Sequence, residues 1–116
     1  MIVITIGMKV YPEKRKEFLQ TVRALIDSIR NEKGCISYRL YQDIENENDL
    51  ILVDEWETQE DLDNHLQSDC FGVLIGAMSL LSEPPEIKFN AVSHKAGMEA
   101  IRATRKQIIN RSNDKL

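Results

Sequence analysis

The stretch from residue 50 to residue 71 gathers the side chains that are best suited to chemistry. It holds His65, one of two histidines, together with Trp56, the only tryptophan, and Cys70, one of two cysteines. A histidine has a pKa of about 6.5, so it can exchange a proton close to neutral pH. We therefore predict a site around His65, which would act as a base or a hydrogen-bond partner. The alternative is a structural histidine that ties a helix to a strand.

Aromatic and apolar side chains would form the walls of such a site. Trp56 is suited to cover an aromatic substrate by stacking, or to anchor the core of a dimer. The remaining substrate contacts that we predict are Tyr38, Leu66, Phe71 and Leu74. In a chain of 116 residues the same side chains are also the natural core, so pocket lining and plain packing both stay open. Arg39 is placed to form an ion pair with Asp54 or Glu55 across a hairpin, and we expect this rather than a catalytic role.

Metal and thiol chemistry are disfavoured. His94 stands far from His65 in the sequence, with no cysteine or acidic ligand at a suitable spacing, so we expect no metal site and no cofactor. Cys70 follows a helix start, where the pKa of a thiol can be lowered, but an inert buried thiol is the commoner outcome. Cys35 and Cys70 form no CxxC motif, which predicts a reduced, cytoplasmic chain. No apolar run approaches the roughly 20 residues of a membrane span.

The pattern of apolar residues predicts the elements that position these side chains. An apolar stripe from Phe18 to Ile29 predicts a long helix that begins at Pro12 and ends near Lys33, before Gly34. Thr58 and Asp61 form a capping box that opens a second helix, and Ser68 opens a third. Strict alternation predicts four strands, over residues 2–10, 35–42, 50–57 and 86–92. The order βαββααβ is the ferredoxin-like α+β arrangement, a four-stranded antiparallel sheet with its helices on one face.

The other face of the predicted sheet also carries apolar residues. Exposing valine, isoleucine and aromatic side chains there would leave a large apolar patch, and such patches usually mark interfaces. A chain of this size buries only about two thirds of its unfolded surface, so association would add stability. We therefore expect a homodimer that packs sheet to sheet.

Charge divides the chain into an acidic body and a basic tail. Residues 1–93 hold 9 Lys and Arg against 17 Asp and Glu, a net charge of −8, and residues 94–116 hold 6 against 2, a net charge of +4. We predict one domain over residues 1–92 and a helical extension over residues 93–116, where Met98, Ile101 and Ile108 have loosely helical spacing. A basic tail can bind nucleic acid or an anionic surface, but docking on its own body or on a partner subunit is favoured. The net charge of −4 argues against nucleic-acid binding by the whole chain.

Three features resemble the antibiotic biosynthesis monooxygenase family, whose members are small dimeric α+β-barrel proteins. The first is the opening strand with Tyr11-Pro12-Glu13-Lys14 and a long helix that ends in Glu32-Lys33-Gly34-Cys35. The second is the tract from Tyr38 to Asp43, which is similar to the family's Tyr-x-Leu-x-x-Asp strand. The third and most specific is the spaced series Glu55, Trp56, Leu62, His65, Ser68 and Phe71. The resemblance covers about residues 1–92.

The resemblance implies a cofactor-independent monooxygenase that oxidises a small aromatic, quinol-like or polyketide-like compound with O₂. Two alternatives stay open. One is a non-catalytic dimer that binds a small molecule or takes part in an assembly. The other is an isomerase for a small phosphorylated or sugar-like substrate, which would need convergent Arg or Lys, and only Arg39 and Lys9 qualify. The haem-degrading branch is disfavoured, because the first strand has no Asn, a His stands where that branch has a Trp, and no His follows Phe71 closely.

Overall fold

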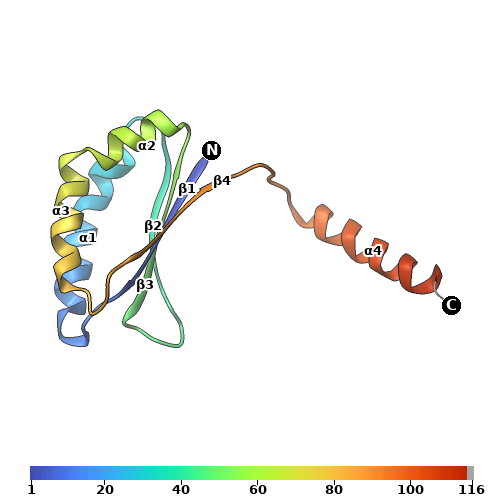
Figure 1. The fold of residues 1–116 in the computed structure, drawn as a ribbon, viewed down its shortest axis with the longest axis horizontal. Coiled ribbons are helices and arrows are strands. Elements are labelled where there is room, and N and C mark those ends of the chain that lie inside the picture. Colours follow the sequence, from blue (N-terminus) through green and yellow to red (C-terminus); the bar gives the residue numbers. More distant parts are fainter. Residues whose placement is uncertain (115–116) are drawn as a thin grey trace.

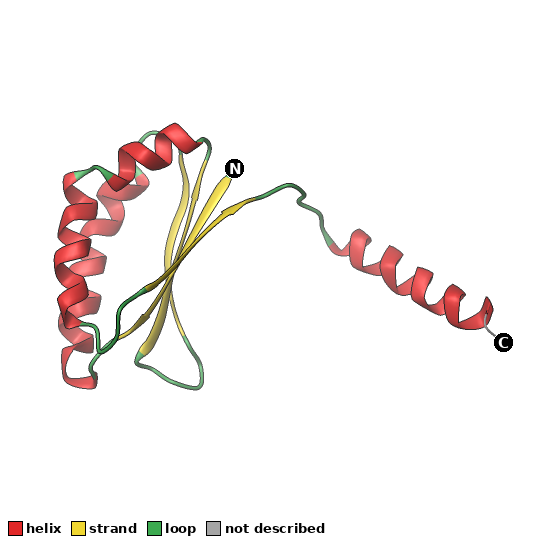
Figure 2. Cartoon of the chain, viewed as in Figure 1, coloured by secondary structure: helices red, strands yellow, loops and turns green. Residues whose placement is uncertain are grey.

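The fold is built on one four-stranded antiparallel sheet. The computed structural model describes residues 1–114, and the side chains of residues 1–107. Neighbouring strands lie in the order β2-β3-β1-β4. Figures 1 and 2 show this sheet beside the helices that cover it. The predicted α+β ferredoxin-like architecture is confirmed, and the strands begin and end close to the predicted residues. They are β1 (Ile2–Lys9), β2 (Cys35–Gln42), β3 (Asp49–Trp56) and β4 (Glu86–Ala91).

Helices cover one face of this sheet. In Figure 1 α1 and α3 lie side by side over the sheet, and α2 connects β3 to α3. Both predicted caps are present: the Thr58 hydroxyl accepts a hydrogen bond from the Asp61 amide, and the Ser68 hydroxyl accepts one from the Phe71 amide. The helical elements are η1 (Pro12–Lys14), α1 (Arg15–Arg30), α2 (Gln59–Leu66), α3 (Asp69–Ala77) and η2 (Met78–Leu80).

Helix α1 is shorter than predicted. It ends at Arg30 rather than near Lys33, because the following residues form a turn in which the Glu32 amide donates to the Ile29 carbonyl. Gly34 closes this turn with a φ of 81°, the left-handed conformation that glycine adopts most easily. The Gly34 carbonyl also accepts a hydrogen bond of 2.9 Å from the Glu57 amide, which fixes the turn to the end of β3.

Side chains at the start of β2 do not follow the strict alternation of an ideal strand. Strict alternation places Ile36 on the same face as Tyr38 and Leu40. A bulge between Cys35 and Ser37 breaks that alternation, and Ile36 is exposed while Tyr38 is buried. Because of the bulge, the exposed Ile36 at the start of β2 does not share the buried face that Tyr38 occupies.

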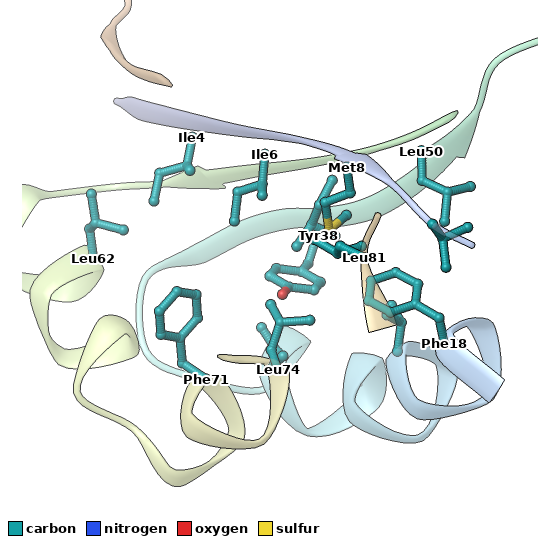
Figure 3. Close-up of a cluster of buried hydrophobic side chains, with 14 of the residues drawn as sticks. Ile4, Ile6, Met8, Phe18, Tyr38, Leu50, Leu62, Phe71, Leu74 and Leu81 are labelled. Atoms are coloured by element: carbon teal, nitrogen blue, oxygen red, sulfur yellow. The ribbon is translucent and has the colours of Figure 1, made fainter. Parts of the chain in front are cut away.

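The core fills the space between the sheet and the helices (Figure 3). Ile4, Ile6 and Met8 alternate along β1 and face Phe18 of α1 and Leu74 of α3, and all five are essentially buried. Burying side chains of this size stabilises a fold by about 1.5–3 kcal/mol each. This layer of side chains fixes the position of the helices relative to β3, where the candidate site lies.

Residues beyond β4 form α4 (Met98–Asp114), which extends away from the body (Figure 1). In the described part of the tail, α4 lies away from the body of its own chain, and docking of the tail on a partner subunit stays a prediction. Ile108 lies outside the residues whose side chains the structure describes. Among the described residues, no helix combines the length and apolar character that crossing a membrane requires.

Candidate active site around His65

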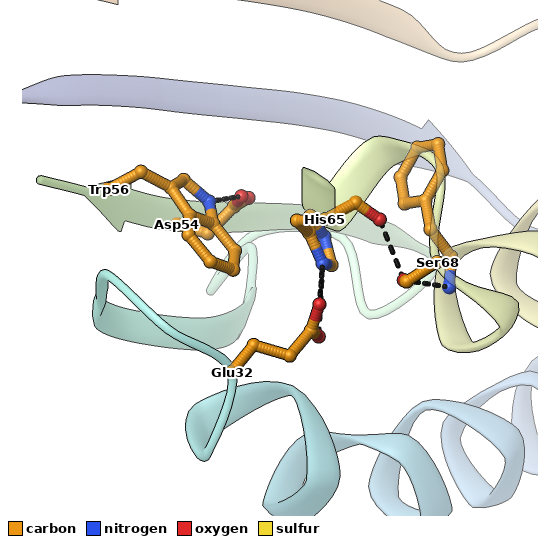
Figure 4. A network of polar contacts seen from close by, with 6 residues as sticks. Glu32, Asp54, Trp56, His65 and Ser68 are labelled. Atoms are coloured by element: carbon orange, nitrogen blue, oxygen red, sulfur yellow. Dashed lines mark hydrogen bonds and ion pairs between the residues drawn. The ribbon is translucent and has the colours of Figure 1, made fainter. Parts of the chain in front are cut away.

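Two capped helices hold His65 against the sheet. The Thr58 cap sets the start of α2, and His65 follows Leu62 by three residues, so both side chains point inward and are buried. At the end of α2 the Ser68 hydroxyl donates to the His65 carbonyl at 2.7 Å and accepts from the Phe71 amide at 3.2 Å (Figure 4). One serine thus ends α2, starts α3 and places Phe71 beside the histidine.

The His65 ring lies among three aromatic side chains. It stacks on Trp56 with 4.5 Å between ring centroids and 23° between planes. Tyr38 and Phe71 meet it edge to face, with centroid distances of 5.7 and 5.3 Å. The imidazole is only 1% exposed. The structure therefore brings together four of the predicted site residues, from β2, β3, α2 and α3.

A carboxylate orients the buried imidazole. His65 Nδ1 lies 3.1 and 3.2 Å from the two carboxylate oxygens of Glu32, which stands in the turn after α1 (Figure 4). Because an ionised carboxylate only accepts hydrogen bonds, we assign the ring proton to Nδ1. The neutral ring then carries its lone pair on Nε2, the nitrogen that can accept a proton. This is the orientation that a general base requires.

A second carboxylate, that of Asp54 on β3, is buried beside this group. The Trp56 indole Nε1 donates to Asp54 Oδ2 at 2.6 Å (Figure 4). The other oxygen, Oδ1, is buried and has no hydrogen-bond partner among the described residues. Asp54 thus fixes the indole ring that stacks on His65, and it keeps one acceptor free inside the protein.

Burial shifts the proton affinity of these groups. Burial raises the pKa of Asp54 to about 6, with a contribution from the nearby Glu32 charge, although the bond from Trp56 acts in the opposite direction. Burial lowers the pKa of His65, and the hydrogen bond to Glu32 opposes this shift. Burial and the Asp54 charge raise the pKa values of Tyr38 and Cys35. A neutral His65 and neutral Tyr38 are the forms that this site favours near neutral pH.

The other predicted contacts lie further out. Leu74 is buried in the core and Leu66 is half-buried on α2. Two cavities run along the edge of β2, and Tyr38 lines one of them, whereas His65 lines neither. Trp56, Phe71 and Leu74 belong to the buried core between the sheet and the helices.

Two interpretations of single residues are wrong. Arg39 forms no ion pair with Asp54 or Glu55 among the described residues, because its cross-strand neighbour is Val53 and Asp54 points to the buried face. Trp56 does not anchor an interface on the outer face of the sheet, because it is fully buried on the helix side against His65.

The sequence reading missed Glu32 and Asp54 as members of the site. A signal existed for Asp54, because it occupies an apolar position in the alternation Leu50, Leu52, Asp54, Trp56. Glu32 gave no such signal beyond its place before Gly34. In the described part of the chain, no group of three His, Cys, Asp or Glu side chains is arranged to hold a metal ion.

Comparison with known proteins identifies relatives. A protein of Synechocystis, sll1783, which is uncharacterised, is 33% identical over 93 residues, covering 79% of this chain and 63% of its own length. YcnE of Bacillus subtilis, named only as a candidate monooxygenase, is 32% identical over 88 residues, which is 75% of this chain and 93% of YcnE. The chain thus spans less than two thirds of the Synechocystis relative and nearly all of YcnE.

Solved structures share the fold. A conserved protein of Methanosarcina mazei superposes with a TM-score of 0.74 at 34% identity, covering 77% of this chain and 89% of that one. Rv0793 of Mycobacterium tuberculosis superposes with a TM-score of 0.76 at 24% identity, covering 83% and 98%. The family description "Antibiotic biosynthesis monooxygenase" matches residues 1–75, which include β1 through most of α3. This range contains every member of the His65 group, by which we mean Glu32, Tyr38, Asp54, Trp56, His65 and Phe71. The chain therefore belongs to the antibiotic biosynthesis monooxygenase family.

Proposed function

We propose that the protein is a cofactor-independent monooxygenase that oxidises a small aromatic compound, quinol-like or polyketide-like, with O₂. The observation that supports this most is the buried His65 ring, which lies among aromatic rings and contacts the half-buried Glu32 carboxylate. Groups with perturbed pKa values that gather in one place are typical of active sites. Four such groups meet here: Asp54, His65, Tyr38 and Cys35.

The proposed reaction begins with proton transfer from the substrate to Nε2 of His65. The carboxylate of Glu32 stabilises the imidazolium that results, since it already accepts the Nδ1 proton. The substrate anion is electron-rich and reduces O₂; one oxygen atom enters the substrate and the other leaves as water with two substrate hydrogens. Trp56, Tyr38 and Phe71 supply the aromatic surface for the substrate ring.

Oxygen uptake tests the proposal. Protein freed of metal ions is mixed with a panel of hydroquinones and anthrones, and the rate is compared with a protein-free control. His65→Gln should lower the rate by about 10²–10⁴-fold, the usual contribution of a general base. Glu32→Gln should give a smaller loss, because it keeps the ring in place but removes the charge. His94→Gln is the matched control, since His94 is exposed and outside the site.

An unchanged rate in His65→Gln would contradict the proposed role of His65. Circular dichroism of each variant separates loss of activity from loss of fold. Uptake at the protein-free rate with every compound would favour the second candidate, a non-catalytic protein that binds small molecules. The 1% exposure of His65 favours that candidate, because a substrate reaches the ring only if neighbouring side chains move.

We also propose that the protein acts as a homodimer packed sheet to sheet. The family is commonly dimeric. On the sheet face away from the helices, Tyr41 pairs with Ile51 and both are exposed, and Val53 lies beside them on the same face. Light scattering at micromolar concentration should give about twice the chain mass of 13.4 kDa.

Ile51→Lys should shift the dimer toward monomer, because it places a charge in the proposed interface. Gln67→Lys adds the same charge at an exposed position at the end of α2 and is the control. A wild-type protein that is monomeric at micromolar concentration would remove this part of the proposal.

A further inference from the structure

A groove between α1 and the edge strand β2 has the features of a binding site separate from His65. Its volume is about 460 Å³, within the usual range of small-molecule sites. Arg30 and Arg39 also line a second cavity of about 350 Å³, which continues along β2 past Tyr38. The groove is therefore a recess along the open edge of the sheet, and not the packed space around the histidine.

One edge of α1 forms the first wall. Leu19, Arg23, Ile26 and Arg30 follow one another at intervals of four, three and four residues, so they lie on one side of the helix. Apolar and cationic side chains alternate along this edge. Leu40 of β2 lines the opposite wall, and Arg39, which pairs with Val53 on the outer face of the sheet, lines the rim of the groove. A ligand in the groove would contact leucine and isoleucine side chains with guanidinium groups between them.

The charge of the groove is opposite to that of the body. Residues 1–93 carry a net charge of −8, yet three arginines and no acidic residue line the groove. Among the described residues, none of the three arginines forms an ion pair. Arg30 donates from Nε and Nη2 to the Tyr38 carbonyl at 3.1 and 2.9 Å, which holds its guanidinium in place. Since a guanidinium has five N–H donors, Arg30 keeps donors for a ligand.

We propose that this groove binds a small amphipathic anion, an aromatic or aliphatic carboxylate. Its apolar body lies on Leu19, Ile26 and Leu40, and its carboxylate lies between the guanidinium groups of Arg23 and Arg30 on α1. Guanidinium and carboxylate match in planar, two-pronged hydrogen bonding. The apolar floor favours a hydrocarbon body over a sugar, whose hydroxyl groups would lose their hydrogen bonds there. This proposal is independent of the proposed oxygenase activity, because His65 does not line the groove.

A matched pair of probes tests the charge requirement. 2-Naphthoate and its neutral analogue 2-naphthamide have the same ring system and differ in the anionic group. Calorimetric titration of the full chain at low salt should give at least about tenfold tighter binding of naphthoate, as expected for charge-assisted hydrogen bonds to arginine. The difference should shrink at about 1 M salt, where exposed charges are screened.

Arg23→Gln tests the location. Arg23 is exposed on α1, so the substitution leaves the core and the outer sheet face intact. It should weaken naphthoate binding by about three- to tenfold and leave naphthamide binding unchanged. Arg102→Gln removes the same charge from α4 and should leave both affinities unchanged. Amide chemical-shift changes on naphthoate addition should map to α1 and β2 and not to α2.

Equal affinity for the two probes, equal effects of Arg23→Gln and Arg102→Gln, or shift changes centred on His65 would each overturn the proposal. The outcome for oxygen uptake is separate. Loss of naphthoate binding in Arg23→Gln with normal turnover would support the groove as an independent site. Failure of uptake with retained, charge-dependent naphthoate binding would leave the groove proposal standing and the oxygenase proposal without support.

Discussion

Asp54→Asn should make the protein more stable at neutral pH. Asp54 is 2% exposed and keeps one carboxylate oxygen without a partner, so its charge is held in an unfavourable place. Asparagine has nearly the same shape, and its carbonyl oxygen can still accept the hydrogen bond from the Trp56 indole. The substitution therefore removes the buried charge and little else.

The magnitude follows from the shift in pKa. The pKa of Asp54 rises from 3.8 to about 6, and each unit corresponds to about 1.4 kcal/mol, so ionised Asp54 destabilises the fold by about 3 kcal/mol. The sign is fixed by proton binding. Between pH 4 and 6 the folded state binds more protons than the unfolded state, so stability falls as pH rises through this window. The stabilisation by Asn should thus be about 1–3 kcal/mol above pH 7, since real sites relax around a charge, and near zero below pH 4.

Urea unfolding provides the assay. Trp56 is the only tryptophan and is fully buried, so its fluorescence reports unfolding directly. Wild type and Asp54→Asn are compared between pH 4 and 8 at one protein concentration, because association makes stability depend on concentration. Glu57→Gln, an exposed carboxylate one residue beyond β3, is the control. The lowered pKa of His65 makes stability change with pH in the opposite direction: stability falls as pH drops below the unfolded pKa of about 6.5. This contribution is the same in wild type and in Asp54→Asn, so it cancels in their difference.

The reasoning is refuted if the stability difference between Asp54→Asn and wild type is the same at pH 4 and pH 8. It is also refuted if the Asn variant is the less stable protein at pH 8. Either result would mean that the folded state accommodates the ionised carboxylate without cost.

Further predictions concern the turns and caps that position the site. Gly34→Ala should destabilise the fold by at least about 1–2 kcal/mol in urea unfolding. The reason is that a Cβ would overlap the Asp61 carboxylate and that the φ of Gly34 lies in the left-handed region. A loss below about 0.5 kcal/mol would show that the turn adapts to alanine. Ser68→Ala should cost about 1 kcal/mol through loss of the α3 cap, with Ser79→Ala, an exposed serine in η2, as the control. The same cap loss should broaden the NMR signals of Phe71, and unchanged signals would mean that Ser68 does not position that ring.

The strands and caps were predictable because their signals are local. Ile4, Ile6 and Met8 alternate along β1, since one face of the sheet is buried under helices, and the alternation survives in the sequence. Thr58 and Ser68 stand directly before apolar runs, where a side chain must satisfy free amides. Each of these inferences needs only a window of a few residues.

The members of the site could not be found in the same way. Glu32 and His65 are 33 residues apart, and no spacing within one element indicates that the α1–β2 turn meets α2. Arg23 and Arg30 lie off the apolar stripe of α1 and look like solvent-facing charges. They line a groove only because α1 lies beside the edge of β2, which also contributes Arg39. Contacts between elements, rather than patterns within them, define both the His65 group and the groove.

The energetic cost of Asp54 bears directly on function. A packed core has no use for an ionised carboxylate with an unpartnered oxygen, since an asparagine or a leucine would stabilise the fold at that position. A site that moves protons does have a use for one, because buried charge tunes the groups around it. Measuring Asp54→Asn in both assays separates these explanations. A variant that gains stability and loses oxygen uptake would place Asp54 in the reaction, as expected where activity is kept at the expense of stability. A variant that gains stability with uptake unchanged would limit Asp54 to holding the Trp56 ring, and would leave the proton chemistry to His65 and Glu32.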